Sequence, residues 1–264
     1  MNIKLIASDL DDTLLDDSKV ISKLNKEAIW RAKEKGIMMT LATGRMFRSA
    51  TIFGDELGID VPLITYQGAL IKTAQSNQVI WSKTIELPIA REIISFGRKH
   101  GFILQIYVDD MLHVDYINTY VANYASFCMV PALAVRDLFT YIQAPPHKIL
   151  MVGEPAELYA AWEEAQQIFD DSVYITKSKP YFLEFTNSEA NKGKALSFLA
   201  ESFGIKKEEI MVIGDNYNDM ELFKAAGLKI AMGNAVDALK EQADFITANS
   251  SENGVAVAIE KFVI

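Results

Sequence analysis

Short apolar runs alternate with longer amphipathic segments at both ends of this chain, and this rhythm restricts the fold more than any other feature. In the N-terminal part it predicts strand 4–7, helix 22–36, strand 37–43, helix 45–57 and strand 62–66. The face of the first helix that we expect to be buried carries Leu24, Ala28, Ile29 and Ala32. Because parallel neighbours need a crossover, the alternation predicts a doubly wound parallel sheet of the α/β class.

The same alternation resumes toward the C-terminus. The predicted elements there are helix 194–204, strand 210–214, helix 219–227, strand 229–232, helix 236–243, strand 244–247 and helix 254–263. We therefore expect the two ends of the chain, residues 1–83 and 187–264, to build one core domain together.

The middle of the chain has the pattern of hairpins instead. Residues 102–116 form two strand-like runs around the pair Asp109-Asp110, and residues 173–186 form two more around a turn that contains proline. Around these runs the sequence predicts a further hairpin at 69–81 and helices at 88–100, 117–127 and 155–169. Since hairpins imply antiparallel pairing, we expect residues 84–186 to form a separate α+β domain inserted into the core.

Composition excludes several classes of function. The chain has 264 residues, 50% of them hydrophobic, and its formal net charge of −9 argues against binding to a nucleic-acid backbone. The single cysteine, Cys128, allows no internal disulfide, which is typical of a reducing compartment. No signal peptide and no apolar run of membrane-spanning length is visible. We expect a cytoplasmic protein with neither a membrane nor a nucleic-acid partner; its oligomeric state is not readable.

Polar residues gather where the predicted parallel strands end, which is where open α/β sheets bind their ligands. Asp9 and Asp11 follow the first strand, and Thr43 with Gly44 closes the second. The C-terminal part adds Lys192 at the start of a helix, Asp215 directly after strand 210–214, and Asp219 four residues later. The predicted fold would bring all of these side chains to one rim of the sheet.

Such a group of carboxylates has to be neutralised. Carboxylates a few ångströms apart raise one another's pKa or recruit a cation. A set of oxygen ligands suits Mg²⁺, which keeps several waters and often shares its coordination shell with a phosphate. A lysine and a threonine hydroxyl beside it could hold the phosphate oxygens. The pattern therefore predicts Mg²⁺-dependent phosphoryl transfer on a small anionic substrate.

Four short motifs carry a resemblance to a known family. Asp9-Leu10-Asp11-Asp12-Thr13 matches the DxDxT signature of the haloacid dehalogenase (HAD)-like hydrolases, and Gly214-Asp-Asn-Tyr-Asn-Asp219 matches their fourth motif. Thr43 and Lys192 match the second and third motifs, respectively. The chain resembles the Cof-type phosphatase branch, and this implies a Rossmann-like core with a large α+β cap inserted between the second and third motifs.

The resemblance also implies a role for each matched residue. Asp9 would be the nucleophile and would form an aspartyl-phosphate that water then hydrolyses. Asp11 would act as general acid and then general base, which requires a pKa above its ordinary range. The implied Mg²⁺ ligands are Asp9, the backbone carbonyl of Asp11, and Asp215. The implied phosphate-binding residues are Thr43, Gly44, Lys192 and Asn218, with Asp219 supporting the site as a further ligand or by orienting Lys192.

The chain departs from the family pattern at two positions. The family commonly has glycine where this chain has Asp12, which we interpret as an exposed turn residue. The branch often has Asn-Gly where this chain has Gln67-Gly68, so we carry no substrate contact over to that position.

Two other functions stay open. A sugar-phosphate mutase would use the same aspartyl-phosphate and pass its phosphoryl group to a second hydroxyl. A receiver-type signalling module would also combine a parallel sheet with an acidic Mg²⁺ pocket, a threonine and a lysine. Receivers, however, phosphorylate an aspartate at the end of the third strand, where this chain has LITYQG. The substrate could be a sugar phosphate, pyridoxal phosphate or flavin mononucleotide.

The predicted cap should hinge over the site and exclude water. The linkers at 84–88 and 186–191 are the candidate hinges, and the strands 102–108 and 181–185 are candidates for substrate specificity. The three histidines are scattered through the middle of the chain without metal-ligand spacing, so we expect them to be structural.

Overall fold

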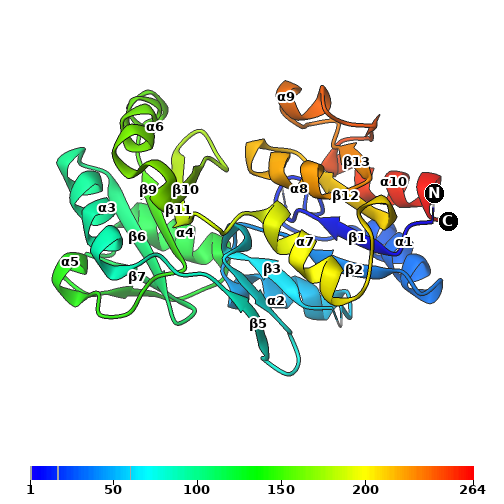
Figure 1. The fold of residues 1–264 in the computed structure, drawn as a ribbon, viewed down its shortest axis with the longest axis horizontal. Helices are drawn as coiled ribbons and strands as arrows, with labels where there is room; N and C mark the ends of the chain where they lie inside the picture. Colours follow the sequence, from blue (N-terminus) through cyan, green and yellow to red (C-terminus); the bar gives the residue numbers. More distant parts are fainter. Residues whose placement is uncertain (1, 17, 60) are drawn as a thin grey trace.

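A five-stranded parallel sheet forms the core of the computed structural model, which describes residues 2–16, 18–59 and 61–264. Its strand order is β14-β13-β12-β1-β2, with bounds Phe245–Ile246, Leu228–Ala231, Ile210–Gly214, Leu5–Ser8 and Met38–Leu41 (Figure 1). The chain leaves β1 in one direction across the sheet and β12 in the other. Right-handed crossovers therefore place helices on both faces, and this confirms the doubly wound α/β class.

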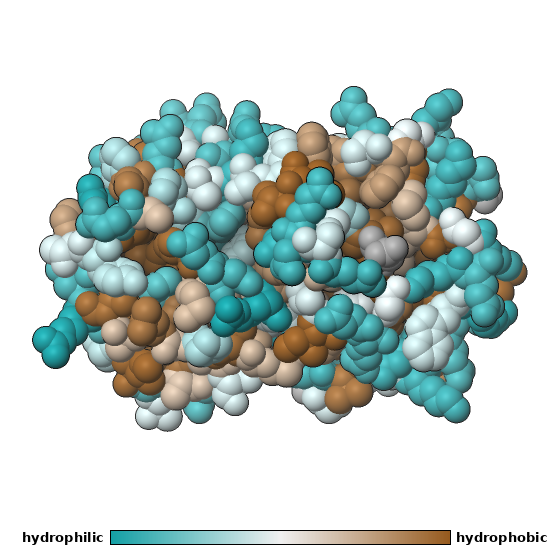
Figure 2. All heavy atoms as spheres, turned by 90° about the horizontal axis from the view of Figure 1, so that it is seen from below, coloured by the Kyte–Doolittle hydropathy of each residue, from teal (hydrophilic) through white to brown (hydrophobic). Residues whose placement is uncertain are grey.

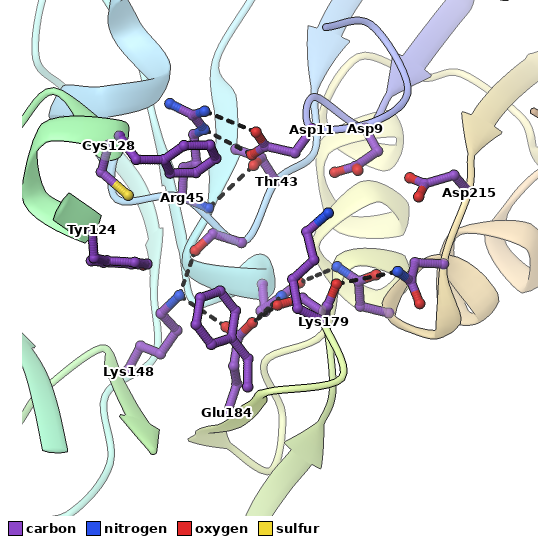
Figure 3. A pocket seen from close by; sticks show the side chains of 17 residues that line it. Asp9, Asp11, Thr43, Arg45, Tyr124, Cys128, Lys148, Lys179, Glu184 and Asp215 are labelled. Atoms are coloured by element: carbon purple, nitrogen blue, oxygen red, sulfur yellow. Dashed lines mark hydrogen bonds and ion pairs between the residues drawn. The ribbon is translucent and has the colours of Figure 1, made fainter. Parts of the chain in front are cut away.

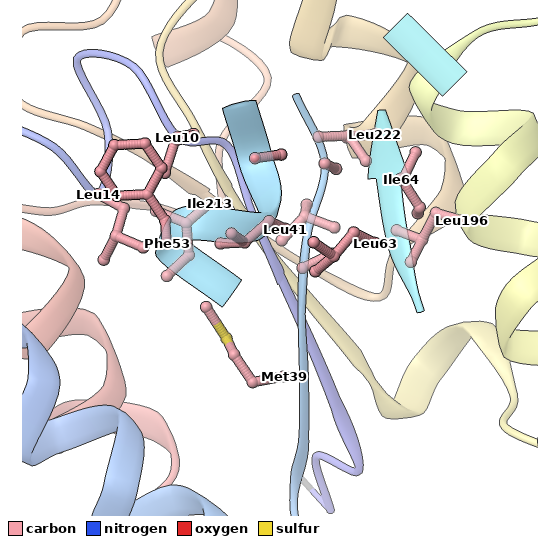
Figure 4. Close-up of a cluster of buried hydrophobic side chains, with 14 of the residues drawn as sticks. Leu10, Leu14, Met39, Leu41, Phe53, Leu63, Ile64, Leu196, Ile213 and Leu222 are labelled. Carbon is pink, nitrogen blue, oxygen red and sulfur yellow. The ribbon is translucent and has the colours of Figure 1, made fainter. Parts of the chain in front are cut away.

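The helices of this core pack in two pairs. α1 (Lys23–Glu34) lies against α10 (Gly254–Phe262), and α7 (Lys192–Ser202) lies against α8 (Met220–Ala225). The remaining core helices are α2 (Phe47–Glu56) and the single-turn α9 (Asp237–Lys240). One detail of the first predicted helix is wrong: Leu24 is 55% exposed, whereas its neighbours on the predicted face are buried. Side chains of the sheet interdigitate with those of the helices in a continuous apolar cluster (Figure 4).

The predicted third strand of the parallel sheet belongs to another sheet. β3 (Leu63–Thr65), β4 (Leu70–Lys72) and β5 (Val79–Ser82) form a three-stranded antiparallel sheet. In the described ranges, β3 lies beside β2 of the core sheet and pairs with it through an isolated parallel bridge between Ala42 and Ile64. The backbone turns back directly after β3, where Tyr66 and Gln67 both have a positive φ, and so β3 pairs with β4.

The inserted cap is built on a six-stranded sheet of order β10-β11-β9-β6-β7-β8. The strands, in that order, are Val173–Thr176, Phe182–Asn187, Lys148–Val152, Ile103–Val108, Met111–Val114 and Ala132–Ala134. The cap helices are α3 (Leu87–Lys99), α4 (Thr119–Cys128), α5 (Leu138–Tyr141) and α6 (Pro155–Phe169). The sequence indicated the hairpins β6–β7 and β10–β11 and the helices α3, α4 and α6. It did not indicate β8, β9 or α5. The boundaries 84 and 186 stay a prediction.

The two faces of the cap sheet have different neighbours. Leu183 and Phe185 of β11 pack in the cluster that contains α3, α5 and α6. Leu150 of β9 and Cys128 of α4 join the core cluster instead. Because successive side chains of a strand alternate in direction, Glu184 must point to the same side as α4, toward the core domain.

The surface carries both polar and apolar side chains. Figure 2 shows hydrophilic side chains over much of one face, with apolar patches between them. None of the helices in the described ranges combines the length and the apolar character that crossing a bilayer requires.

Candidate active site

The carboxyl ends of three parallel strands meet at one pocket between core and cap. β1 pairs with β12 and with β2, in a register that places Ser8 beside both Ile213 and Leu41. The residues that follow these strand ends therefore lie side by side. The predicted residues that line the pocket are Asp9, Asp11, Thr43, Gly44, Asp215 and Asn218 (Figure 3). The remaining two, Lys192 and Asp219, are buried next to Asp9.

Lys192 links two of the carboxylates. Its Nζ donates to Asp9 Oδ1 and to Asp219 Oδ1, at 2.7 Å each, and its side chain is fully buried. Burial would lower the pKa of Lys192, but the charges of Asp219 and Asp9 raise it above its ordinary value. The other oxygen of Asp219 accepts hydrogen bonds from the backbone N–H groups of Asp215 and Asn216. Both oxygens of Asp219 are therefore already engaged.

Asp9 and Asp215 are both buried, but of the two only Asp9 is paired with a basic side chain in the described ranges, that of Lys192. Burial raises the pKa of Asp9 to about 7, and the charge of Asp219 adds to this, although Lys192 acts in the opposite direction. Burial, together with the charges of Asp9 and Asp219, also raises the pKa of Asp215 well above its ordinary value. Asp215 Oδ1 accepts a hydrogen bond from Thr13 Oγ1 at 2.8 Å. The two carboxylates therefore create a region of negative potential. Asp9 Oδ2 and Asp215 Oδ2 are the oxygens not engaged by Lys192 or Thr13.

This pair fits a divalent cation. Oxygen atoms of Asp9, Asp215 and Asp219 lie within 4.8 Å of one another, which is close enough for a shared ion. Because Lys192 and two backbone N–H groups occupy Asp219, the carboxylates left for direct coordination are Asp9 and Asp215. Mg²⁺ is commonly held by one or two carboxylates and completes its octahedron with water and phosphate oxygens. The donor set therefore suits Mg²⁺.

Asp11 is held by an arginine that the sequence analysis did not include in the site. Arg45 Nε and Nη2 donate to the two oxygens of Asp11 at 2.8 Å each, and Arg45 Nη1 donates to Ser49. Burial of Asp11 would raise its pKa, yet this bidentate guanidinium lowers it below its ordinary value. The direction is opposite to the one expected for a general acid. Asp11 is therefore held in a bidentate ion pair with Arg45, and this pair favours its ionised form.

The loop after β2 presents a hydroxyl to the pocket. Thr43 Oγ1 accepts the backbone N–H of Arg45 at 3.1 Å, so its own hydrogen can be donated to a ligand. The carbonyl of Gly44 accepts a hydrogen bond from Lys148 Nζ of the cap at 2.7 Å. A Cβ at Gly44 would lie 2.4 Å from the side-chain amide of Gln67, so a larger residue here would require that amide to move.

A chain of polar groups joins the cap to the core. Lys148 Nζ donates to Glu184 Oε2 at 2.8 Å, in an ion pair of which both side chains are almost completely buried. Glu184 Oε1 accepts a hydrogen bond from Gln67 Nε2 at 3.2 Å, and Gln67 Oε1 accepts one from Asn218 Nδ2 at 3.1 Å. The extra methylene of Gln67 thus lets it reach both Glu184 and Asn218.

Asp12 is not the exposed turn residue that the sequence suggested. It is partly buried, and its carboxylate pairs with Lys19 of the core and Lys179 of the cap. Its φ of 61° lies in the left-handed region, which favours glycine and is tolerated by aspartate. The ion pairs with Lys19 and Lys179 offset part of the cost of burying this carboxylate.

Several pocket residues were not found from the sequence. They come from α4, β9 and the β10–β11 hairpin, and they are Tyr124, Phe127, Cys128, Lys148, Ser178, Lys179, Phe182 and Glu184. The candidate strand 181–185 does contribute to the lining, whereas no described side chain of 102–108 does. None of the three histidines lines the described pocket. Period-two alternation could have identified Phe182 and Glu184 as one face of their strand, but not which face is inside.

Comparisons with known proteins agree on one family. The family model for haloacid dehalogenase-like hydrolases matches residues 6–259. The chain is 31% identical to 5-amino-6-(5-phospho-D-ribitylamino)uracil phosphatase YcsE of Bacillus subtilis, over 100% of this chain and 97% of that protein. It is 25% identical to pyridoxal phosphate phosphatase YbhA of Escherichia coli over the whole of both chains, 100% of each. A crystal structure of a haloacid dehalogenase-like hydrolase from Bacteroides thetaiotaomicron has a TM-score of 0.88 at 31% identity, covering 98% of this chain and 99% of that one.

Proposed function

Because the chain belongs to the haloacid dehalogenase-like hydrolases and is a phosphatase of that family, we propose that it hydrolyses a small organic phosphomonoester with Mg²⁺, through an aspartyl-phosphate on Asp9. The observation that carries this proposal is the position of Asp9. Its carboxylate lies in the pocket between the ammonium group of Lys192 and the carboxylate of Asp215. An anionic nucleophile there can approach an anionic ester only if nearby positive charge offsets their repulsion.

In the first half of the reaction, the free oxygen of Asp9 attacks phosphorus, and the bond from phosphorus to the leaving oxygen breaks. Thr43 and Lys192 would donate to the phosphoryl oxygens, and the amide of Asn218 would add a third donor. The carboxyl group of Asp11 would protonate the leaving oxygen. Bound Mg²⁺, held by Asp9, Asp215 and the carbonyl of Asp11, would neutralise charge on the transferred group.

In the second half, water attacks the phosphorus of the aspartyl-phosphate and releases inorganic phosphate and free Asp9. Asp11, now a carboxylate, would take the proton from this water. Both roles require an Asp11 that can reach the substrate, whereas Arg45 now engages both of its oxygens. We infer that, when a substrate enters the pocket, Arg45 releases Asp11 and the freed carboxylate takes up from solvent the proton that it then gives to the leaving oxygen.

The cap would close over this site and open to release product. Asn187 Nδ2 donates to the carbonyl of Thr84 at 2.9 Å, so the two predicted linkers lie side by side. This arrangement supports a hinge formed by residues 84–88 and 186–191.

The printed names of the relatives indicate small phosphorylated metabolites as the substrate class. One relative is named for a ribitylaminouracil phosphate and another for pyridoxal phosphate. We propose that this chain also acts on such a metabolite, in the cytoplasm. A sugar-phosphate mutase stays the alternative, because it would share the intermediate. The family match leaves the receiver-type module without support.

The decisive experiment follows phosphate release from a panel of phosphorylated metabolites with Mg²⁺ present. Asp9→Asn should lose at least about a thousandfold in kcat, while its circular dichroism and unfolding midpoint stay close to those of the native protein. Mass spectrometry of the acid-quenched native enzyme should show one phosphoryl group on the peptide that contains Asp9. Turnover retained by Asp9→Asn would remove Asp9 as nucleophile. An isomerised phosphate ester without free phosphate would establish the mutase.

A further inference from the structure

The segment 43–48, which runs from the end of β2 into α2, lines the pocket and is held from the cap. Lys148 Nζ of the cap donates to the carbonyl of Gly44 at 2.7 Å. Farther along the segment, the backbone N–H of Arg48 donates to the carboxylate of Asp110, at 3.0 Å from Oδ2 and 3.2 Å from Oδ1. Asp110 also belongs to the cap and lies between β6 and β7. The cap therefore contacts this segment at two points.

Asp110 supplies negative charge to the N-terminus of a core helix. The N-cap residue of α2 is Met46, whose side chain has no oxygen to accept a hydrogen bond from the first N–H groups. Those groups form the positive end of the helix dipole, where a carboxylate is stabilising. The Asp110 carboxylate takes this place although it comes from a distant part of the sequence. This stabilisation of α2 therefore requires the cap to be in contact with the core.

The same carboxylate holds a second loop of the core. The hydroxyl of Tyr66 donates to Asp110 Oδ1 at 2.6 Å. Burial and the charge of Asp110 raise the pKa of Tyr66 well above its ordinary value, so this hydroxyl keeps its proton and stays a donor. Two backbone hydrogen bonds join the second loop to the first: Tyr66 N–H donates to the carbonyl of Arg45 at 2.9 Å, and Gln67 N–H donates to that of Thr43 at 3.1 Å. Asp110 therefore contacts both of the loops whose backbone fixes Thr43 and Arg45.

The β6–β7 hairpin itself does not need the Asp110 carboxylate. Asp109 and Asp110 are its two turn residues, since Val108 pairs with Met111. Both have a positive φ, 49° and 57°, which is typical of a type I′ turn and favours glycine at the second position. Replacing Asp110 by glycine should therefore preserve the hairpin and isolate the effect of the carboxylate on the core.

We propose that Asp110 is a positioning residue for the reaction, which fixes the loop of Thr43 and Arg45 from the cap and so completes the site only while the cap is closed. Asp110 is not among the described residues that line the pocket, so it acts through this loop. Because opening of the cap would break both contacts, loss of the carboxylate should lower the population of the closed state. The apparent affinity for substrate falls in proportion to that population. This inference rests on the proposed phosphatase function and adds a residue to it.

The first test measures phosphate release by variants of this turn, with Mg²⁺ and the best ester of the metabolite panel. Asp110→Gly should lower kcat/KM about tenfold, the size expected for loss of a hydrogen bond to a charged group, and Asp110→Asn, which keeps one acceptor oxygen, should lower it less. The matched control is Asp109→Gly, which removes the same charge from the exposed neighbouring position and should leave kcat/KM unchanged.

The division between KM and kcat distinguishes positioning from a loss of stability. The effect of Asp110→Gly should come mainly from KM, because saturating substrate itself favours closure. A variant that only unfolds more easily loses active enzyme, and this lowers the apparent kcat and leaves KM unchanged. Equal kinetics of Asp110→Gly and Asp109→Gly, or an effect confined to kcat, would overturn the inference.

The second test asks whether the two loops are held by one contact. Tyr66→Phe removes the hydroxyl that donates to Asp110 and should raise KM about two- to tenfold. In the Asp110→Gly background the same change should have little further effect, because its acceptor is already absent. Effects of the two changes that simply add would contradict a shared contact at Asp110.

A measurement without turnover separates this inference from the proposed function. Cys128, the only cysteine of the chain, is buried at the pocket where α4 of the cap faces the core (Figure 3). Opening of the cap should expose its thiol to a soluble disulfide reagent such as dithionitrobenzoate. Asp110→Gly should therefore react about tenfold faster than the native protein, and Asp109→Gly at the native rate. Urea unfolding of each variant gives the contribution of global unfolding, which is subtracted.

The outcomes of this labelling experiment do not depend on catalysis. Faster labelling of Asp110→Gly alone would support the role of Asp110 even if the native enzyme released no phosphate from any ester, a result that would refute only the phosphatase function. Equal labelling rates in the three proteins would overturn the inference and leave the phosphatase function intact.

Discussion

Replacing Glu184 by glutamine should destabilise the protein more than any comparable change on its surface. Glu184 and Lys148 are 2% and 3% exposed, and their charged atoms are 2.8 Å apart. Glutamine keeps the size of the side chain but leaves the ammonium group of Lys148 buried without a carboxylate. Three donors also converge on Glu184, from Lys148, Ser178 and Gln67, whereas glutamine offers only one oxygen to them.

The size of the expected loss in unfolding free energy follows from the burial of this ion pair. Removing one member of a buried ion pair costs about 3–5 kcal/mol, because the other charge stays buried and uncompensated. In a chain of this size each kcal/mol lowers Tm by about 2–4 °C, so Glu184→Gln should lower it by on the order of 10 °C. Since a paired apolar replacement is often close to neutral, Lys148→Met combined with Glu184→Met should recover most of that loss.

Calorimetry and urea unfolding of the full chain measure both effects. The matched control is Glu164→Gln, since Glu164 pairs with Lys99 at 2.9 Å in the same cap but at an exposed position. Exposed pairs of this kind often contribute nothing measurable, so this variant should unfold like the native protein. If Glu184→Gln proved as stable as Glu164→Gln, the buried pair would not stabilise the folded chain as we argue.

Three further predictions concern the metal, the acid and a partly buried histidine, His147. EDTA should abolish phosphate release and Mg²⁺ should restore it; activity without any divalent cation would refute the charge argument. Asp11→Asn should lower kcat by at least about a hundredfold with the fold intact, and an unchanged rate would assign acid–base catalysis to another group. Burial lowers the pKa of His147 from its ordinary 6.5 despite the nearby carboxylates of Asp110 and Asp109, so the folded state binds fewer protons than the unfolded state. Stability should therefore fall as pH drops below about 6.5, and His147→Gln should weaken that dependence in unfolding experiments at pH 5 to 8.

The position of the carboxylates could be predicted from the sequence because two rules act together. Apolar runs of strand length identify β1 and β12, and parallel pairing brings the residues after both strands to the same edge of the sheet. Asp9 and Asp215 lie directly after those runs. The match of four motifs with a known family added roles to these positions, but the positions themselves follow from the topology.

Other features depended on tertiary contacts that local patterns do not contain. Arg45 begins the segment before α2, where a basic residue is ordinarily solvated, and only the folded chain brings it to Asp11. Lys148 is a buried lysine, which is rare without a partner, and its partner lies on another strand. The run Ile149–Val152 meets the pattern of a buried strand, so β9 could have been predicted from it. β3 pairs with β4 across a turn in which two non-glycine residues have a positive φ, and sequence rarely reveals such a turn.

The acidic side chains around the pocket differ in how they are neutralised, and this difference bears on the reaction. Asp11 forms an ion pair with Arg45, and Glu184 forms one with Lys148. Lys192 forms ion pairs with both Asp9 and Asp219. Asp215 accepts a hydrogen bond from the hydroxyl of Thr13, but no basic side chain in the described ranges lies within ion-pair distance of it. A phosphate dianion entering beside it would add negative charge where compensation is already weakest. Substrate binding, and not only the chemical step, should therefore depend on a cation at Asp215, because Coulomb repulsion in a buried site grows as the effective dielectric constant falls.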